Sequence, residues 1–308
     1  MLVGNKSKSV AIKTLVEFAA KTGSLDRKFT PSPSAQEGIQ GHRRVTANRH
    51  KTYQTEIPLS INYDGITFRG RADGYDPKKH CIEEIKTFYG EFNNIPKNHQ
   101  LLHWAQVRCY GWMYCEIFGC DQINLTLVYF NLADQQEYLL EESWSAIDLK
   151  KFGGDLAEKY CQWQAHIDKR LIRLTSWIKQ LKFPHGELYD SQRVMAEAVY
   201  KAAALGRVLL AEAPTGTGKT LAGLFPAIKS MVRTPVDKIF YLTAKTTGKQ
   251  LALDNIQLIA SDKTHLEVSP LRTLELTAKE NGRNRVIMIP STDNEVLQQT
   301  GNLHHTLI

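Results

Sequence analysis

The chain has 308 residues, which is enough for two domains that each bury their own core. Lys and Arg number 39 against 32 Asp and Glu, and the net charge of +7 favours a polyanionic partner such as nucleic acid. The five cysteines include no CxxC pair, which argues against a disulfide framework and a zinc ribbon, and no apolar run approaches the ~18 residues of a membrane span. We therefore expect a soluble, cytoplasmic protein that does not enter a membrane.

Residues 1–145 have the pattern of two helices, three strands, a helix and two strands. Apolar spacing predicts helices over 9–23 and 35–50, the second weakened by two glycines. Strands on either side of Asp64-Gly65, a two-residue hairpin signal, precede a third strand in "HCIEEIKTF". A long helix over 98–119 should end at its glycine, and "INLTLVYFNL" and "EYLLEES" should form two more strands.

A different pattern follows the first domain. Residues 146–184 are predicted to form a basic, amphipathic helical linker. From 185 to 280, short apolar strands such as "RVLLAEA" and "KIFYLTA" alternate with helices, which indicates a parallel, doubly wound α/β sheet. The local signals of 281–308 are poorly consistent, and we expect an atypical tail of the kind that a frame shift leaves.

The segment "APTGTGKT" (213–220) has the composition of a phosphate-binding loop. Glycines let backbone N–H groups curl around a phosphate, a lysine reaches its outer oxygens, and a hydroxyl holds Mg²⁺ at a helix N-terminus. Ala213 stands where the strict pattern has its first glycine, and a glycine-rich turn that binds nothing is the alternative. The residues that would bind ATP are Thr215, Gly216, Thr217, Gly218, Lys219 and Thr220, the last also as a metal ligand.

An acidic-x-lysine pattern occurs four times, at Asp26–Lys28, Asp76–Lys78, Glu84–Lys86 and Asp148–Lys150. Only Glu84–Lys86 lies on a predicted strand that is preceded by a strand ending in an acidic residue, Asp73. Side chains at i and i+2 of a strand share a face, so Glu84 and Lys86 lie together while Glu83 points away.

Two carboxylates that converge repel each other unless a cation lies between them, and their hard oxygens suit Mg²⁺ or Mn²⁺. A lysine beside that metal could orient the attacking water and stabilise charge that develops on a phosphate. A salt-bridged hairpin with an exposed Glu/Lys pair is the other interpretation of Asp73, Glu84 and Lys86.

The element order, "GRAD", "EEIK" and "HWAQVRCYGWMYC" together resemble the PD-(D/E)xK nuclease family, in particular its RecB-like branch. The resemblance implies a mixed sheet flanked by helices and a Q-x-x-x-Y element on one helix face. The implied catalytic residues are Asp73, Glu84, Lys86, Gln106 and Tyr110, and the implied metal ligands are His42, Asp73, Glu84 and the Ile85 carbonyl. As alternatives, His42 could be a surface histidine, and Gln106 with Tyr110 a packing face.

The segments "YDSQRVM", "LLAEAPTGTGKT" and "IFYLTAKTTGKQ" resemble superfamily 2 helicases of the DinG/XPD type. The resemblance implies a partial RecA-like domain in which Tyr189 and Gln192 contact adenine and Thr243, Lys245 and Thr246 contact DNA. Gln192 could instead be an exposed residue at a helix start, and 243–246 a turn with a capping threonine.

The second acidic helicase motif, the second RecA-like domain and the iron–sulfur cysteines of that family are not in this sequence. The two resemblances therefore imply a DNA nuclease, dependent on Mg²⁺ or Mn²⁺, joined to the ATP-binding front of a truncated helicase. We expect single-stranded or forked DNA as its partner, a role in DNA repair or processing, and little unwinding. The alternative is a remnant that binds DNA or ATP without catalysis.

Overall fold

The computed structural model describes residues 8–22, 33–214, 216–234, 236–243, 246–261 and 269–275. Contacts divide the chain into two compact units, one spanning Lys6–Ala165 and the other beginning at His166. The predicted tail 281–308 lies outside the described residues.

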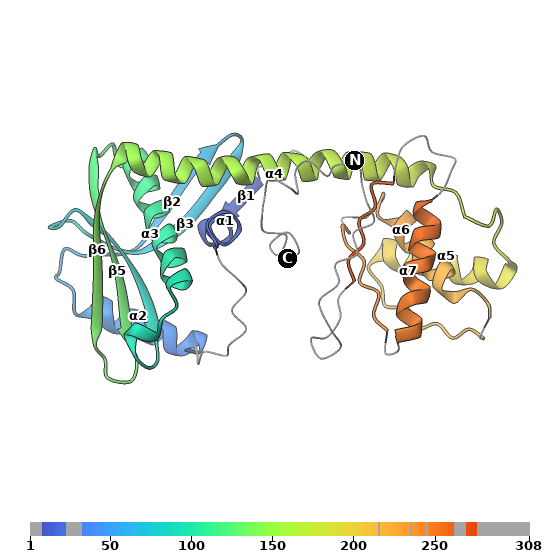
Figure 1. Cartoon of the computed structure of the whole chain (residues 1–308), viewed down its shortest axis with the longest axis horizontal. Helices are drawn as coiled ribbons and strands as arrows, with labels where there is room; N and C mark the ends of the chain where they lie inside the picture. The colour runs from blue at the N-terminus through green and yellow to red at the C-terminus, as the bar shows by residue number, and fades with distance from the viewer. Residues whose placement is uncertain are drawn as a thin grey trace. The chain divides into compact units, whose positions relative to one another are not determined.

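The first unit is built on a mixed six-stranded sheet in the order β1-β3-β4-β5-β6, with β2 also paired to β3 (Figure 1). The pairs β1–β3 and β4–β5 are parallel and the other pairs are antiparallel. The strands are β1 (Lys8–Ala11), β2 (Gln54–Tyr63), β3 (Ile66–Asp76), β4 (Cys81–Phe88), β5 (Gln122–Asn131) and β6 (Glu137–Ser145). The expected mixed sheet flanked by helices is thus confirmed for this unit.

The β2–β3 hairpin turns at Asp64 and Gly65, as predicted. Both residues have a positive φ, 49° and 76°, which is the left-handed backbone that a two-residue hairpin turn requires. Strand β1 was not predicted, because three of its four residues were assigned to the start of the 9–23 helix. That helix, α1, spans Ile12–Ala19. Pairing of β1 with β3 is a tertiary contact that four residues cannot signal by their own pattern.

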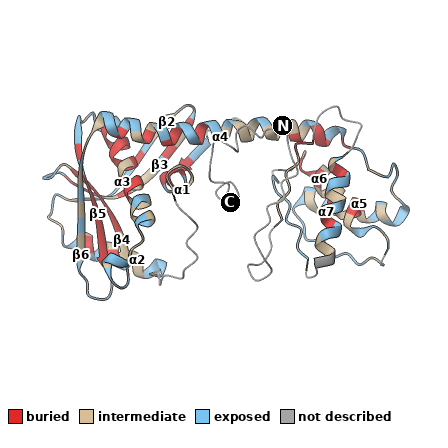
Figure 2. Ribbon diagram, viewed as in Figure 1, coloured by how far each residue is buried: buried red, intermediate tan, exposed pale blue. Residues whose placement is uncertain are grey.

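Helices cover both faces of the sheet (Figure 2). Helices α1 and α3 (Lys97–Phe118), with the first part of α4 (Ala146–Gln180), pack on one face and bury most of the core. Helix α2 (Ala35–Ala47) packs on the opposite face through Val45, which meets Ile85 and Val128. The short 3₁₀ helix η1 (Phe92–Asn94) precedes α3.

Local chemistry sets the ends of the two helices that carry candidate site residues. Helix α2 starts at a capping box, in which the Ser34 hydroxyl accepts from the Glu37 N–H and the Glu37 carboxylate accepts from the Ser34 N–H. Helix α3 ends at Gly119, whose φ of 69° is the left-handed conformation that terminates helices. The predicted end of this helix is therefore confirmed.

The second unit contains helices α5 (Asp190–Leu205), α6 (Lys219–Ser230), α7 (Thr246–Ala260) and the last part of α4. Its core is formed by apolar residues of α4, α6 and α7, among them Trp177, Ile178, Leu224, Ile228 and Ile259. None of the helices in the described part of the chain is both long and apolar enough to cross a membrane.

The parallel sheet predicted for 185–280 is not present in the described residues, and this prediction was wrong for them. The segments 207–214, 236–243 and 269–275 form no strands. A parallel strand needs hydrogen-bonded neighbours and cover on both faces, whereas Val208 and Leu210 are both 99% exposed. The apolar runs correctly signalled extended chain, but an apolar run carries no information about a pairing partner.

Candidate functional site

A notch in the sheet of the first unit lies between β1 and β4. On one edge of β3, β1 pairs with Ile66–Arg69 and β4 pairs with Gly74–Asp76. Between these two ladders, residues 70–73 of β3 have no strand partner on this edge in the described sheet. The last β3–β4 pair, Gly74–Glu83, places Asp73 next in register with Glu84 at the point where the strands diverge.

At the notch, the Asp73 carboxylate makes polar contacts with β4 and with α2. Its Oδ2 accepts a hydrogen bond of 2.7 Å from the Ile85 N–H, and its Oδ1 lies 3.3 Å from His42 Nδ1 of α2. The N–H and C=O of one strand residue point to the same edge. The Ile85 carbonyl therefore points into the notch as well, although the Ile85 side chain is buried in the cluster under α2.

Glu84, Lys86 and Gln106 form one hydrogen-bonded network. Glu84 Oε1 accepts from Lys86 Nζ and from Gln106 Nε2, both at 2.7 Å. Lys86 Nζ also donates to Gln106 Oε1 at 3.1 Å, and Gln106 Nε2 reaches the Tyr110 hydroxyl at 3.2 Å. Strand alternation and the i, i+4 spacing on α3 bring these side chains together.

Burial makes this network electrostatically unusual. Glu84 is only 3% exposed, and burial raises its pKa to about 7 against the opposing charge of Lys86. The hydrogen bond with Asp73 raises the pKa of His42, with burial acting in the other direction. Burial also raises the pKa of Tyr110, so its hydroxyl stays protonated.

The donor set suits a hard cation. The second carboxylate oxygen of Glu84, Oε2, is buried and has no hydrogen-bond partner, which is costly unless something binds it. Asp73 and the Ile85 carbonyl supply further oxygen ligands of the kind that Mg²⁺ and Mn²⁺ prefer. In the described ranges no three His, Cys, Asp or Glu side chains are grouped closely enough to hold a metal by themselves. A metal at this point therefore needs the backbone carbonyl and water in addition to the two carboxylates.

Behind the notch, on the opposite face of the sheet, lies a cluster that the sequence did not reveal. Glu83 Oε2 accepts from Arg49 Nε at 3.0 Å and from the Tyr53 hydroxyl at 2.9 Å. Arg49 also donates to Glu137 of β6 at 2.9 Å. Strand alternation predicted only that Glu83 points away from Glu84. Its partners lie 30 or more residues distant, and no short-range pattern signals them.

Neither a protein-family model nor a curated protein matches this chain. Solved structures that are distantly similar to it include that of SSO0001 and that of a phage-related exonuclease. The first, of SSO0001, covers 50% of this chain and 77% of its own, at 19% identity and a TM-score of 0.33. The other, a phage-related exonuclease from Haemophilus somnus 129PT, covers 53% of this chain and 97% of its own, at 15% identity and a TM-score of 0.34. The assignment of the site therefore depends on its geometry.

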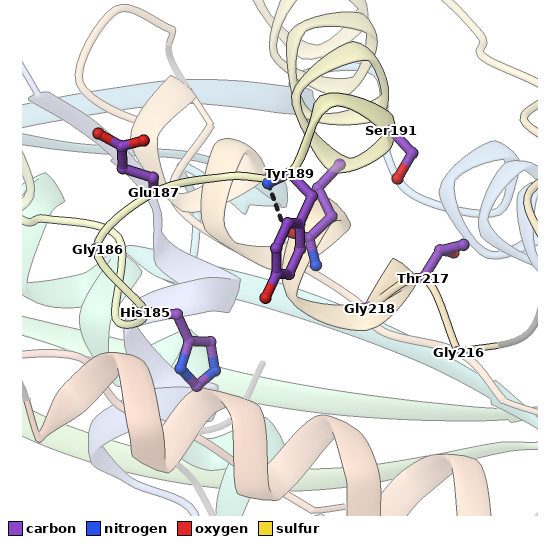
Figure 3. A pocket seen from close by; sticks show the side chains of 9 residues that line it. His185, Gly186, Glu187, Tyr189, Ser191, Gly216, Thr217 and Gly218 are labelled. Atoms are coloured by element: carbon purple, nitrogen blue, oxygen red, sulfur yellow. Dashed lines mark hydrogen bonds between the residues drawn. The ribbon is translucent and has the colours of Figure 1, made fainter.

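A second candidate site lies in the second unit, around the glycine-rich loop. A cavity of about 730 Å³ is lined by 185–187, Tyr189, Ser191, Gln192 and 216–218 (Figure 3). Gly216 and Gly218 have φ of 84° and 71°, which only glycine adopts without strain. A Cβ at Gly218 would overlap the Gln192 amide, so the loop and the start of α5 are in close contact.

Of the other predicted residues of this unit, only some lie within the described part of the chain. Gln192 Oε1 accepts from the Tyr189 N–H at 3.2 Å, so it caps α5 and also lines the cavity. Lys219 Nζ donates to the Ala213 carbonyl, and Thr220 lies in the first turn of α6. Thr243 lies beside Gly248 of α7. Thr215, Lys245 and the side chain of Thr246 lie outside the described residues.

Proposed function

We propose that the first unit is a metal-dependent nuclease that hydrolyses phosphodiester bonds of DNA at the notch between β3 and β4. The observation that carries this proposal is the convergence of Asp73, Glu84 and Lys86 at an open notch in the sheet, with one oxygen of Glu84 buried and without a partner. Asp73, Glu84 and the Ile85 carbonyl would hold Mg²⁺ or Mn²⁺, and His42 would assist from α2. A bound metal would polarise the phosphate and lower the pKa of a bound water.

The remaining residues of the notch would orient the reaction. Lys86 is held by Glu84 and Gln106, so its ammonium group has a fixed direction. From that place it can align the attacking water and stabilise the charge that develops on the phosphate oxygens. Gln106 and Tyr110 would hold the side chains of Lys86 and Glu84 in position. The net charge of +7 would favour binding of a polyanion such as DNA.

The test is digestion of end-labelled single-stranded DNA by the purified full chain with Mg²⁺, Mn²⁺ or EDTA. Cutting should require the metal and fall at least about 100-fold in Lys86→Ala, the range expected when a group that orients a proton transfer is removed. Lys78→Ala is the matched control, because Lys78 belongs to another acidic-x-lysine pair and is exposed in the turn between β3 and β4. Equal cutting by wild type and Lys86→Ala would disprove the nuclease assignment.

We also propose that the second unit binds ATP, as in a chain of DinG/XPD-like helicase ancestry. The cavity between the glycine-rich loop and the start of α5 favours this, because Tyr189 lines it together with Gly216 and Gly218 of the loop (Figure 3). Gln192 is also among its lining residues. Tyr189 is 78% exposed and presents its ring for stacking on adenine. Lys219 and Thr220 would meet the phosphates and Mg²⁺, and Thr243, Lys245 and Thr246 would contact DNA.

ATP binding is tested by titrating a fluorescent ATP analogue into wild type and Lys219→Ala. The wild type should bind in the presence of Mg²⁺ and the variant should lose most of its affinity. We expect little hydrolysis with or without DNA. Equal affinities for the two proteins would exclude the loop as the site, and rapid turnover would contradict the expectation of little hydrolysis.

A further inference from the structure

The geometry of the notch also depends on residues that lie on the opposite face of the sheet. Asp73 and Glu84 sit where β3 and β4 separate, and only three residue pairs join those strands beyond this point. Their separation therefore depends on what holds the last pair, Gly74 and Glu83. A polar cluster, formed by the buried Glu83 and the partly buried Arg49 and Tyr53, lies directly at that pair.

Tyr53 joins both strands of the last pair. Its hydroxyl donates to Glu83 of β4 at 2.9 Å, and its ring lies over Gly74 of β3 so closely that a Cβ there would overlap the tyrosine. Burial raises the pKa of Tyr53, with the charge of Glu83 adding to the effect, so the hydroxyl remains a donor. One side chain thus spans the point at which the two strands diverge.

Arg49 ties the same carboxylate to the rest of the unit. It follows α2, the helix that carries His42, and it bridges Glu83 of β4 to Glu137 of β6. The Glu83 side chain is 4% exposed and that of Arg49 is 17% exposed, so both charges depend on their partners. Loss of one partner leaves a buried charge that must be relieved by movement of β4 or of the residues after α2.

We propose that Arg49, Tyr53 and Glu83 are positioning residues that set the distance between Asp73 and Glu84 and so the affinity of the notch for a divalent cation. This inference rests on the proposed function. None of the three touches the notch itself. They act through the backbone, because Glu83 precedes Glu84 and Gly74 follows Asp73. Mutation of residues that orient metal ligands typically weakens metal affinity or activity by 10–100-fold.

The experiment measures Mn²⁺ binding to the full chain, without DNA, by the loss of the free Mn²⁺ signal in electron paramagnetic resonance. Tyr53→Phe keeps the ring over Gly74 and removes only the hydroxyl, and Glu83→Gln keeps the shape and removes the charge. We expect both variants to raise the Kd for Mn²⁺ by about 10–100-fold. Circular dichroism and thermal unfolding establish that each variant is folded. If Glu83→Gln does not fold, the Kd of Tyr53→Phe, the milder change, tests the proposal.

The matched control is Glu142→Gln. Glu142 of β6 also accepts from an arginine, Arg108, and from an aromatic donor, Trp144, but it has no contact with the β3–β4 pair. Its substitution should leave the Kd for Mn²⁺ unchanged. Unchanged affinity in folded Tyr53→Phe and Glu83→Gln, or an equal loss in Glu142→Gln, would overturn the positioning role.

The two proposals fail in different ways. A wild-type chain that neither binds Mn²⁺ nor cuts DNA would overturn the proposed function itself. A wild-type chain that binds Mn²⁺ and cuts, with Tyr53→Phe and Glu83→Gln indistinguishable from it, would overturn only the positioning role.

Discussion

Glu83 and Glu84 are neighbours in β4 and point to opposite faces of the sheet. Glu84 faces α3 and meets Lys86 and Gln106, whereas Glu83 faces the end of α2 and meets Arg49. The period of two residues predicted this division from the sequence. The partners of Glu83 could not be predicted, because they are 30 or more residues distant and are brought to it only by the packing of α2 on the sheet.

His103 of α3 should make the stability of the first unit depend on pH. Its Nδ1 lies 2.8 Å from the Tyr129 hydroxyl, and burial lowers its pKa from 6.5 to about 3, with the charge of Lys86 adding to the effect. Because the unfolded chain binds the proton more readily, stability should be fully present above pH 6.5 and fall as the pH drops toward 3. Urea unfolding at several pH values should show a shallower decline in His103→Gln. An identical decline in wild type and His103→Gln would contradict the lowered pKa of His103.

Helix α2 lies close to the sheet because of one glycine. A Cβ at Gly41 would lie 2.5 Å from Thr87 Cγ2 and 3.0 Å from Leu132 Cδ2, whereas a Cβ at Gly38 would meet only Thr87 Oγ1 at 3.6 Å. The sequence predicted α2 but treated both glycines as weaknesses of the helix. The close approach at Gly41 is set by the opposing strands, which no helix pattern contains.

The two glycines should therefore respond oppositely to alanine. Gly38→Ala should stabilise the unit by about 0.5–1 kcal/mol through the backbone entropy of glycine. Gly41→Ala should destabilise it by about 1–3 kcal/mol, because α2 must move away from the sheet and take His42 with it. Chemical denaturation of both variants measures the difference. A stabilised Gly41→Ala would show that α2 does not need this close contact.

The two units of the molecule were predicted with unequal success. For the first unit, hairpin chemistry, helix ends and strand alternation predicted the elements, and the resemblance to the PD-(D/E)xK family implied the mixed sheet. For the second unit, the helices α5, α6 and α7 were predicted but the parallel sheet was not found in the described residues. Helix signals are local, whereas a strand needs a neighbour that its own sequence does not name.

Each unit has its own core, so substitutions should act on one unit at a time. Lys229 of α6 donates to the carbonyls of Ile178, Lys179 and Leu181 at the end of α4, at 2.9, 3.3 and 3.1 Å. Lys229→Met should leave these carbonyls unsatisfied and cost about 1 kcal/mol. Hydrogen exchange should quicken in peptides from α6 and remain unchanged in peptides from α3. Faster exchange in α3 would contradict separate cores.

The central claim, that Asp73, Glu84 and Lys86 cut DNA, is tested most directly by comparing the two neighbouring glutamates of β4. The measurement is the single-turnover rate of DNA cleavage by the full chain at saturating Mn²⁺. Glu83→Gln should approach the wild-type rate, because excess metal offsets a weaker site. Glu84→Gln should lose about 3 kcal/mol of transition-state stabilisation or more, roughly 100-fold in rate. Equal rates for Glu84→Gln and wild type would contradict the account.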